Sequence, residues 1–174
     1  MQYFAQISDP HLSSLEGVRA RELLSKRALG YLSWTRRRRF EHRPEVLTAL
    51  QHDLDQFTLD QILVTGDLTH IGLPAEFEQA ARWLTELGSP EDVNLIPGNH
   101  DACVSAPWKN TFALWREYMA PDKPQPGQAH DALFPSLRVR GDIAFIGVTT
   151  GVPKPPLMAT GTAGETQRDH VARL

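Results

Sequence analysis

The sequence predicts an α/β layered sandwich, in which strands form a largely parallel sheet and helices pack outside it. Two observations support this class. Short apolar runs rich in β-branched residues, each closed by Gly or Pro, are typical of buried strands. These runs alternate with longer segments that carry apolar residues at helical spacing, which is the signature of a parallel sheet covered by helices. The expected strands cover residues 3–7, 61–65 and 92–96.

Two helices are expected between these strands. Residues 44–57 begin with Pro44, which suits a first helical position, and their apolar residues form one stripe. Residues 74–87 carry a second apolar stripe, and Gly88 is expected to end that helix. The order strand, helix, strand, helix, strand follows from these assignments.

The segment before Pro44 has a mixed pattern. A helix is expected around Val18–Leu32, with Gly17 and Gly30 interrupting it. This segment continues into four consecutive arginines, which we interpret first as a solvated loop or helix face.

The last third of the chain is expected to contain short elements and loops. Gly141-Asp142 between two alternating runs is a two-residue hairpin signal of the Gly-first kind. Pro- and Gly-rich stretches predict surface loops. The expected ranges are a short helix at 110–119, a loop at 121–135, strands at 137–140 and 143–146, a loop at 151–164 and the start of a helix at 165–174.

Length and composition are those of a single globular domain spanning residues 1–174, with 41% hydrophobic and 22% charged residues. The net charge of −3 gives no global reason to expect a nucleic-acid partner. Cys103 is the single cysteine, so no intrachain disulfide can form, and no activating base for it is evident. No apolar run approaches the about 20 residues that span a bilayer, and no signal peptide is evident. A cytoplasmic location is therefore expected.

Polar clusters directly follow the three expected strands. They are Asp9-Pro10-His11, Gly66-Asp67 and Gly98-Asn99-His100-Asp101. Because open α/β sheets bind ligands at the carboxyl ends of their strands, we expect these side chains to lie close together. Each cluster alone is a weak signal, since Gly-Asp is common in turns. Together, their carboxylates, imidazoles and amide predict a metal centre.

In this order the three clusters resemble the opening pattern of the calcineurin-like metallophosphoesterase superfamily: Asp-x-His, Gly-Asp, and Gly-Asn-His followed by Asp or Glu. Spacing and flanks are similar to the class III cyclic nucleotide phosphodiesterase branch, with some similarity to UDP-diacylglucosamine pyrophosphatases. The family pattern continues with another strand-end His and a Gly-His-x-His cluster, which this chain lacks. The resemblance therefore implies the N-terminal portion of the family domain, with the sandwich incomplete at the C-terminus.

The resemblance implies a metal-dependent hydrolase of phosphate esters, with a phosphodiesterase as the leading assignment. Two divalent ions, Mn, Fe or Zn, would activate a hydroxide. Asp67 would bridge the ions, Asp9 and His11 would complete one side, and Asn99 would bind the second ion.

The catalytic roles are implied by the same resemblance. His100 would face the substrate and donate a proton to the leaving alkoxide, and Asp101 would orient it. The expected substrate is a small phosphorylated molecule, either a nucleotide or another phosphodiester.

Two alternatives stay open. The absence of the later histidines of the family pattern favours a non-catalytic or incomplete binding domain of the same type. The other alternative is a pyrophosphatase acting on a nucleotide-linked lipid precursor. Such an enzyme could touch a membrane surface weakly through the arginine run, which Trp34 and Phe40 flank and which consists of Arg36, Arg37, Arg38 and Arg39.

The other histidines are expected to have ordinary surface roles: His42 and His52 on helix surfaces or a loop, His130 in a Pro-rich loop, and His170 in the last helix. His70 differs, because it is close enough to Asp67 in sequence to approach the site. Cys103 is expected to be either buried or incidental to the chemistry.

Overall fold

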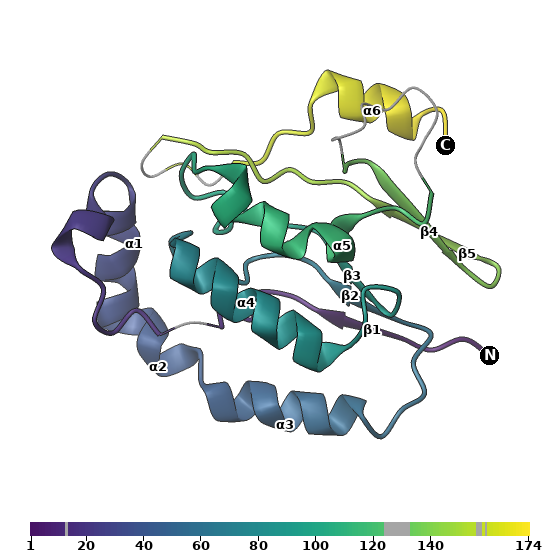
Figure 1. Cartoon of the computed structure of the whole chain (residues 1–174), viewed down its shortest axis with the longest axis horizontal. Coiled ribbons are helices and arrows are strands. Elements are labelled where there is room, and N and C mark those ends of the chain that lie inside the picture. Colours follow the sequence, from purple (N-terminus) through teal and green to yellow (C-terminus); the bar gives the residue numbers. More distant parts are fainter. Residues whose placement is uncertain (13, 124–132, 156–157, 159) are drawn as a thin grey trace.

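The computed structural model describes residues 1–12, 14–123, 133–155, 158 and 160–174. Three strands form a parallel sheet in the order β1-β2-β3 (Figure 1): β1 (Phe4–Ile7), β2 (Gln61–Val64) and β3 (Val93–Leu95). Ile7 pairs with Val64, and Val64 pairs with Leu95, so the strands end at one edge of the sheet. The expected α/β class and the three expected strands are thereby confirmed.

Two of the helices lie in the connections between strands, as predicted: α3 (Pro44–Leu54) between β1 and β2, and α4 (Pro74–Leu87) between β2 and β3. Helix α4 has the predicted bounds, and its buried face joins the sheet residues in the main core. Helix α3 ends three residues earlier than predicted, and Phe57 is 56% exposed. The predicted apolar stripe therefore covers the core only in part.

The segment before α3 is more helical than the sequence predicts. A 3₁₀ turn (Ala20–Leu23) precedes a continuous helical segment made of α1 (Arg27–Ser33), a π-helical stretch (Trp34–Arg38) and α2 (Arg39–Glu41). The predicted break at Gly30 is wrong. A Cβ on Gly30 would collide with the side chain of Ile71, so its bare backbone lets α1 approach the loop after β2.

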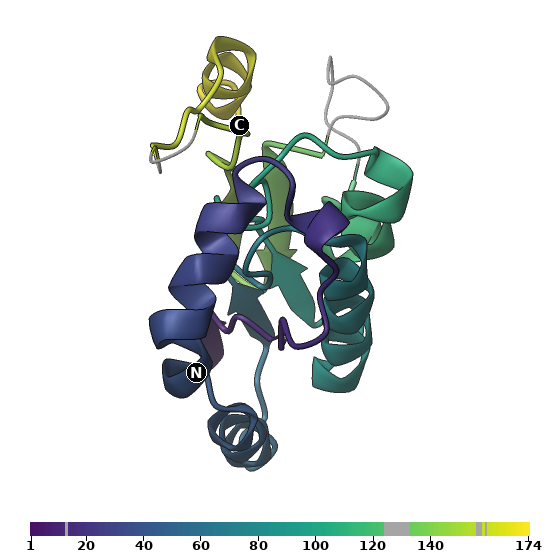
Figure 2. The ribbon, with the colours of Figure 1, turned by 90° about the vertical axis from the view of Figure 1, so that its left-hand side faces the viewer.

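This helical segment stands beside the carboxyl ends of the strands, with α4 on the other side (Figure 2). The contact is fixed by polar bonds as well as by packing. Arg27 donates from Nε to the Ile71 carbonyl at 3.2 Å and from Nη2 to the Gly72 carbonyl at 2.6 Å. Among the described residues, no helix combines the length and the apolar content that crossing a membrane requires.

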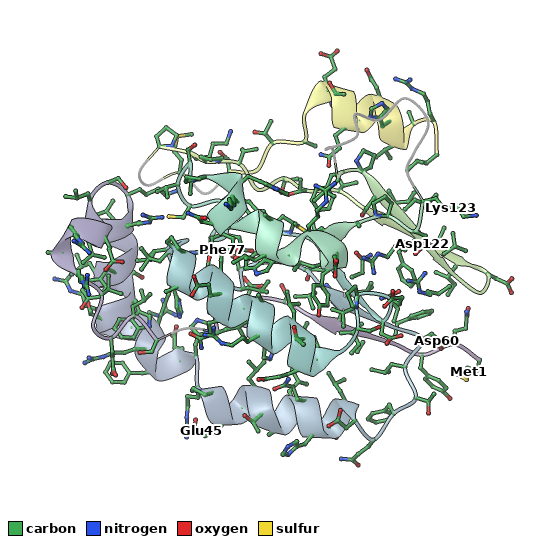
Figure 3. All side chains as sticks on the ribbon, in the orientation of Figure 1. Met1, Glu45, Asp60, Phe77, Asp122 and Lys123 are labelled. Atoms are coloured by element: carbon green, nitrogen blue, oxygen red, sulfur yellow. The ribbon has the colours of Figure 1, made fainter. Side chains whose placement is uncertain are left out.

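The last third of the chain forms a short helix, a hairpin and a final helix: α5 (Arg116–Met119), β4 (Ser136–Arg140), β5 (Ile143–Gly147) and α6 (Glu165–Val171). The antiparallel pairing of β4 with β5 confirms the expected hairpin, with Gly141 at a φ of 56°. Phe77 of α4, labelled in Figure 3, packs against Trp115 just before α5, with ring centroids 4.4 Å apart and the rings tilted by 30°. Much of the expected loop at 121–135 lies outside the described residues.

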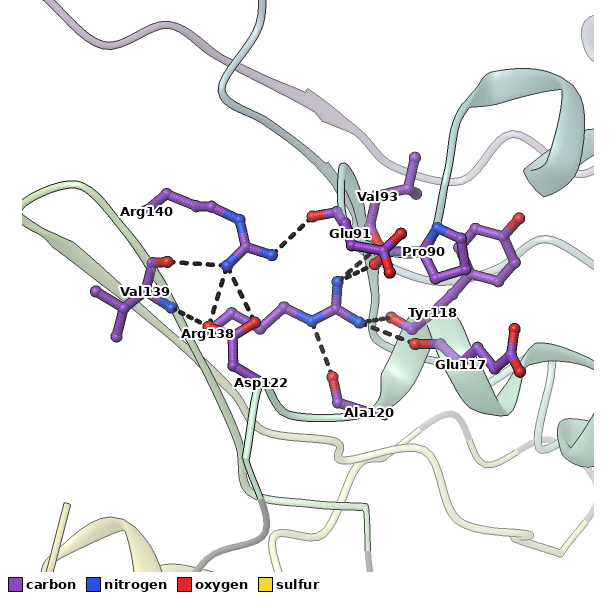
Figure 4. A network of polar contacts seen from close by, with 10 residues as sticks. All are labelled: Pro90, Glu91, Val93, Glu117, Tyr118, Ala120, Asp122, Arg138, Val139 and Arg140. Carbon is purple, nitrogen blue, oxygen red and sulfur yellow. Dashed lines mark hydrogen bonds and ion pairs between the residues drawn. The ribbon is translucent and has the colours of Figure 1, made fainter.

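Arg138 anchors this hairpin to the rest of the fold (Figure 4). Its side chain is buried, and its guanidinium donates to five backbone carbonyls: those of Pro90, Val93, Glu117, Tyr118 and Ala120. A single side chain thus joins β4 to α5 and to the start of β3.

Candidate metal centre

The three polar clusters occupy tight loops at the strand ends. Asp9, His11 and Asp67 have φ values of 54°, 42° and 56°, a left-handed region that residues other than Gly rarely adopt. The first loop is bonded to the second, because the Asp9 N–H donates to the Gly66 carbonyl at 3.2 Å and the His11 N–H donates to the Asp67 carbonyl at 3.1 Å. These bonds stabilise the left-handed backbone of the loops that carry Asp9, His11 and Asp67 at the carboxyl ends of the strands.

The second and third loops touch without intervening side chains. Gly66 has a φ of 89°, and a Cβ there would lie 2.5 Å from the Gly98 nitrogen. A Cβ on Gly98 would overlap the carboxylate of Asp67. Glycine at these two positions therefore lets the third loop lie directly against Asp67.

Three candidate ligands meet at this contact. Ligand atoms of His11, Asp67 and His100 all lie within 4.8 Å of one another. The predicted ligands Asp9 and Asn99 join Asp67 in lining a cavity of about 370 Å³. Asp67 belongs to both sets, whereas His11 does not line this cavity and Asp9 is not part of the group of three. The structure therefore places the other three predicted ligands around Asp67, with His100 beside them.

Among the described residues, only one ring nitrogen of His11 has a hydrogen-bond partner. Its Nδ1 lies 2.8 Å from the carbonyl of Thr69, and because a carbonyl only accepts, Nδ1 carries the proton. A carbonyl partner of this kind is what commonly orients a metal-binding histidine. Burial, followed by the nearby imidazole of His100, lowers the pKa of His11 to about 4. The ring is therefore neutral near pH 7, as metal ligation requires.

Asp67 lies in surroundings that suit a bound cation. Burial raises the pKa of its carboxyl group, and the nearby carboxylate of Asp9 raises it further. The His100 N–H opposes this by donating to Asp67 Oδ1 at 2.8 Å. Two neighbouring carboxylates beside neutral imidazoles form a donor set that a divalent ion fits, because the ion would offset their repulsion.

Asp101 contacts the backbone of the loops, whereas the sequence suggested contact with His100. Its buried carboxylate accepts from the N–H groups of Asp67, Thr69 and Gly98, each at 2.9 Å, and from the Thr69 hydroxyl at 3.0 Å. Burial raises its pKa to about 7, against the effect of these hydrogen bonds. The Nδ1 of His100 instead donates to the carbonyl of His70 at 2.7 Å.

Two further histidines pack around His11. The ring of His70 stacks on it at 4.8 Å between centroids, and the ring of His42 meets it edge-on at 4.5 Å. Burial, followed by His11, lowers the pKa of His70 to about 3. The expected surface role of His42 is wrong, because α2 brings it back onto the centre. No motif marked His42, whereas the proximity of His70 to Asp67 in sequence was a usable signal.

Arg38 is the second functional candidate that the sequence did not single out. Its Nη1 lies 3.0 Å from Nε2 of His100 and 3.2 Å from Nδ1. The neighbours Arg36, Arg37 and Arg39 are exposed, as the solvated interpretation expects. Arg38 alone of the four is turned toward the centre, so a fixed positive charge stands beside the proposed proton donor.

A larger cleft of about 620 Å³ adjoins the centre at His11 and His42. Aromatic side chains, including Trp34 and Phe40, line it together with basic side chains. The basic residues are Arg39, Arg43 and Arg82. Glu16 and Glu86 also line the cleft, so an organic group would meet aromatic surface and charges of both signs there.

The remaining candidates lie elsewhere. His52 is exposed on α3 and His170 is part of α6. His130 lies outside the described residues. Cys103 is buried as expected, and burial raises the pKa of its thiol.

Comparison with protein families gives one match relevant to this geometry. Residues 3–153 match the family model described as calcineurin-like phosphoesterase. The matched range includes the sheet, the three strand-end loops and the hairpin. Comparison with curated proteins gave no match.

Proposed function

Because the chain belongs to the calcineurin-like phosphoesterase family, whose chemistry is metal-dependent hydrolysis of phosphate esters, we propose that it is a phosphodiesterase with a dinuclear centre. The observation that carries this proposal is the meeting of His11, Asp67 and His100 within 4.8 Å at the strand ends. The similarity to the class III cyclic nucleotide phosphodiesterase branch supports the diesterase assignment, and the substrate that we propose is a small nucleotide or another phosphodiester.

Four residues would hold the ions. We assign Asp9 and His11 to one ion, Asn99 to the other, and Asp67 to both. Divalent ions there would neutralise phosphate oxygens and lower the pKa of a bound water. The free Nε2 of His11 and the paired carboxylates of Asp9 and Asp67 support this assignment.

The chain's own groups would handle the substrate. The His70 carbonyl fixes the His100 ring by accepting from Nδ1, so that Nε2 would face the leaving oxygen. The imidazolium form of the ring, which is protonated at both nitrogens, would give its Nε2 proton to that oxygen. Arg38, now beside Nε2, would move to a non-bridging phosphate oxygen, since a guanidinium forms strong charge-assisted hydrogen bonds with phosphate. Asp101 is a positioning residue that holds the backbone of the second and third loops.

A diester is favoured over a monoester by the space around the centre. A diester carries two organic groups, so one must be accommodated while the other leaves. The cleft that adjoins His11 and His42 offers room for such a group.

The test is hydrolysis of bis-p-nitrophenyl phosphate and p-nitrophenyl phosphate by the chain loaded with Mn²⁺. We expect faster turnover of the diester, and Asp67→Asn should lower its kcat/KM on the order of 10³-fold or more. Asp169→Asn on the exposed side of α6 is the matched control and should retain the rate. Bound Mn²⁺ without diester hydrolysis would overturn the diesterase assignment. Absence of both metal and phosphate binding would favour a non-catalytic domain.

A further inference from the structure

We propose that one face of the α1–α2 helical segment docks on the surface of an anionic lipid bilayer. We call this the outer face and define it by the exposed residues Leu29, Leu32, Arg36, Arg37, Arg39 and Phe40. The inference goes beyond hydrolysis, because it concerns where the molecule is held.

The charge of this region contrasts with that of the chain. Residues 26–43 contain seven Lys or Arg and one Glu, although the whole chain has a net charge of −3. Within the outer face, Arg37 is paired with Glu41 at 2.7 Å. Among the described residues, no salt bridge neutralises Arg36 or Arg39. A concentrated positive charge thus faces solvent on an otherwise acidic protein.

Apolar side chains are interspersed with these arginines. Leu29, Leu32 and Phe40 are 45%, 43% and 64% exposed. Their exposure is not the result of a loose helix, because Trp34 on the same segment is only 5% exposed and Arg27 is bonded to the loop after β2. The inner contacts therefore fix the helix in an orientation that presents leucines and a phenylalanine outward.

This combination matches an interfacial helix. Such helices bury apolar side chains at the boundary between headgroups and acyl chains while basic residues contact anionic headgroups. A nucleic acid would satisfy the arginines but would leave the two leucines exposed. A bilayer satisfies both kinds of side chain, so we assign the partner as anionic lipid.

The outer face is also close to the candidate metal centre. Arg39 and Phe40 belong both to the outer face and to the lining of the larger cleft. Arg38 of the same segment points inward to His100. A docked molecule would therefore hold the mouth of its cleft beside the lipid headgroups.

The test therefore uses Arg36 and Arg37, which belong to the outer face but do not line the larger cleft. Sedimentation with phosphatidylglycerol–phosphatidylcholine vesicles, compared with phosphatidylcholine alone, measures docking without metal or substrate. We expect wild-type binding to the anionic vesicles that weakens as salt increases. The Leu29→Ser, Leu32→Ser double variant and the Arg36→Gln, Arg37→Gln double variant should each lower the partition coefficient on the order of tenfold or more. Arg36→Lys with Arg37→Lys should retain it.

Matched controls alter the same kinds of residue elsewhere. Val139→Ser with Ile146→Ser changes exposed apolar positions of the hairpin, and Arg168→Gln with Arg173→Gln changes exposed arginines near the C-terminus. Both controls should bind vesicles like the wild type. Equal binding by the outer-face variants and the wild type, or wild-type binding to single-stranded RNA but not to anionic vesicles, would overturn the proposal. Because no turnover is measured, an inactive centre does not alter this result.

Discussion

The two ring nitrogens of His100 have different partners. Nδ1 donates to a backbone carbonyl, which Nε2 does not contact, and the guanidinium of Arg38 lies near both nitrogens but closer to Nε2. A histidine held in this way can serve either as the proton donor that we propose or as an additional metal ligand. The two roles differ in how the rate depends on the leaving group.

We predict that His100→Gln slows alkyl phosphodiesters much more than bis-p-nitrophenyl phosphate. An alkoxide needs a proton as it leaves, whereas p-nitrophenolate is stable without one, so the alkyl substrate should lose on the order of 10²–10⁴-fold in kcat. Steady-state rates with both substrates, together with Mn²⁺ content, measure the difference. Equal losses accompanied by lost metal would instead make His100 a ligand.

Residue identity predicted part of this centre. Asp9, His11, Asp67 and Asn99 could be proposed because each follows a strand, and parallel strands end at one edge. Arg38 and His42 could not, since their approach depends on how a distant helix packs. The short-range pattern around them resembles an ordinary solvated surface.

At the scale of elements, strong periodicity was the best guide. The apolar stripe and the stop at Gly88 located α4 at its observed bounds. The prediction for α1 is wrong at Gly30, because glycine commonly interrupts a helix, whereas here its bare backbone provides close contact with Ile71. Helix propensity is a property of the local chain. The need for glycine at position 30 comes instead from packing against Ile71, which lies 41 positions away in the sequence.

Arg138 gives a test of how the hairpin is attached. We predict that Arg138→Lys lowers the free energy of unfolding by about 2–4 kcal/mol, because an ammonium cannot reach five carbonyls and leaves buried acceptors without donors. Denaturant unfolding measures this, with Arg168→Lys on exposed α6 as a control expected to change stability by less than about 0.5 kcal/mol. A similar small change in both variants would refute the anchoring role.

The same hairpin gives a pH-dependent test through Asp122. Burial alone would raise the pKa of this carboxyl, but the Val139 N–H at 2.7 Å and Arg140 at 3.0 Å lower it below its usual 3.8. Its contribution to stability is therefore present above pH 3.8 and lost as pH falls through the lowered value. Asp122→Asn should cost about 0.5–1 kcal/mol near pH 7, since the pair is partly exposed. The gap from wild type should close on acidification, and a gap that widens would contradict this account.

At the scale of the whole molecule, the sheet is what assembles the centre. Candidate ligands separated by up to 90 positions meet because β1, β2 and β3 lie side by side. The fold class followed from the alternation of strands and helices. The arrangement of α1 and α2 over the strand ends did not, because it depends on long-range packing that no local pattern encodes.

Metal binding should consequently stabilise the entire fold. An ion that binds the assembled ligands but not the unfolded chain raises the free energy of unfolding by about 2.7 kcal/mol at 100 times its Kd. We expect Mn²⁺ to raise the midpoint temperature of thermal unfolding and EDTA to reverse this increase. The Asp67→Asn variant should lose most of the increase. An equal increase in Asp67→Asn would assign the stabilisation to ions bound elsewhere.

The left-handed backbone at Asp9 and Asp67 has a practical consequence. Asparagine tolerates that conformation better than most other residues with a side chain, and it removes the negative charge while nearly preserving shape. Asparagine at both positions should therefore yield an inert molecule with its native architecture intact. Such a protein could trap an unreacted ester for crystallography.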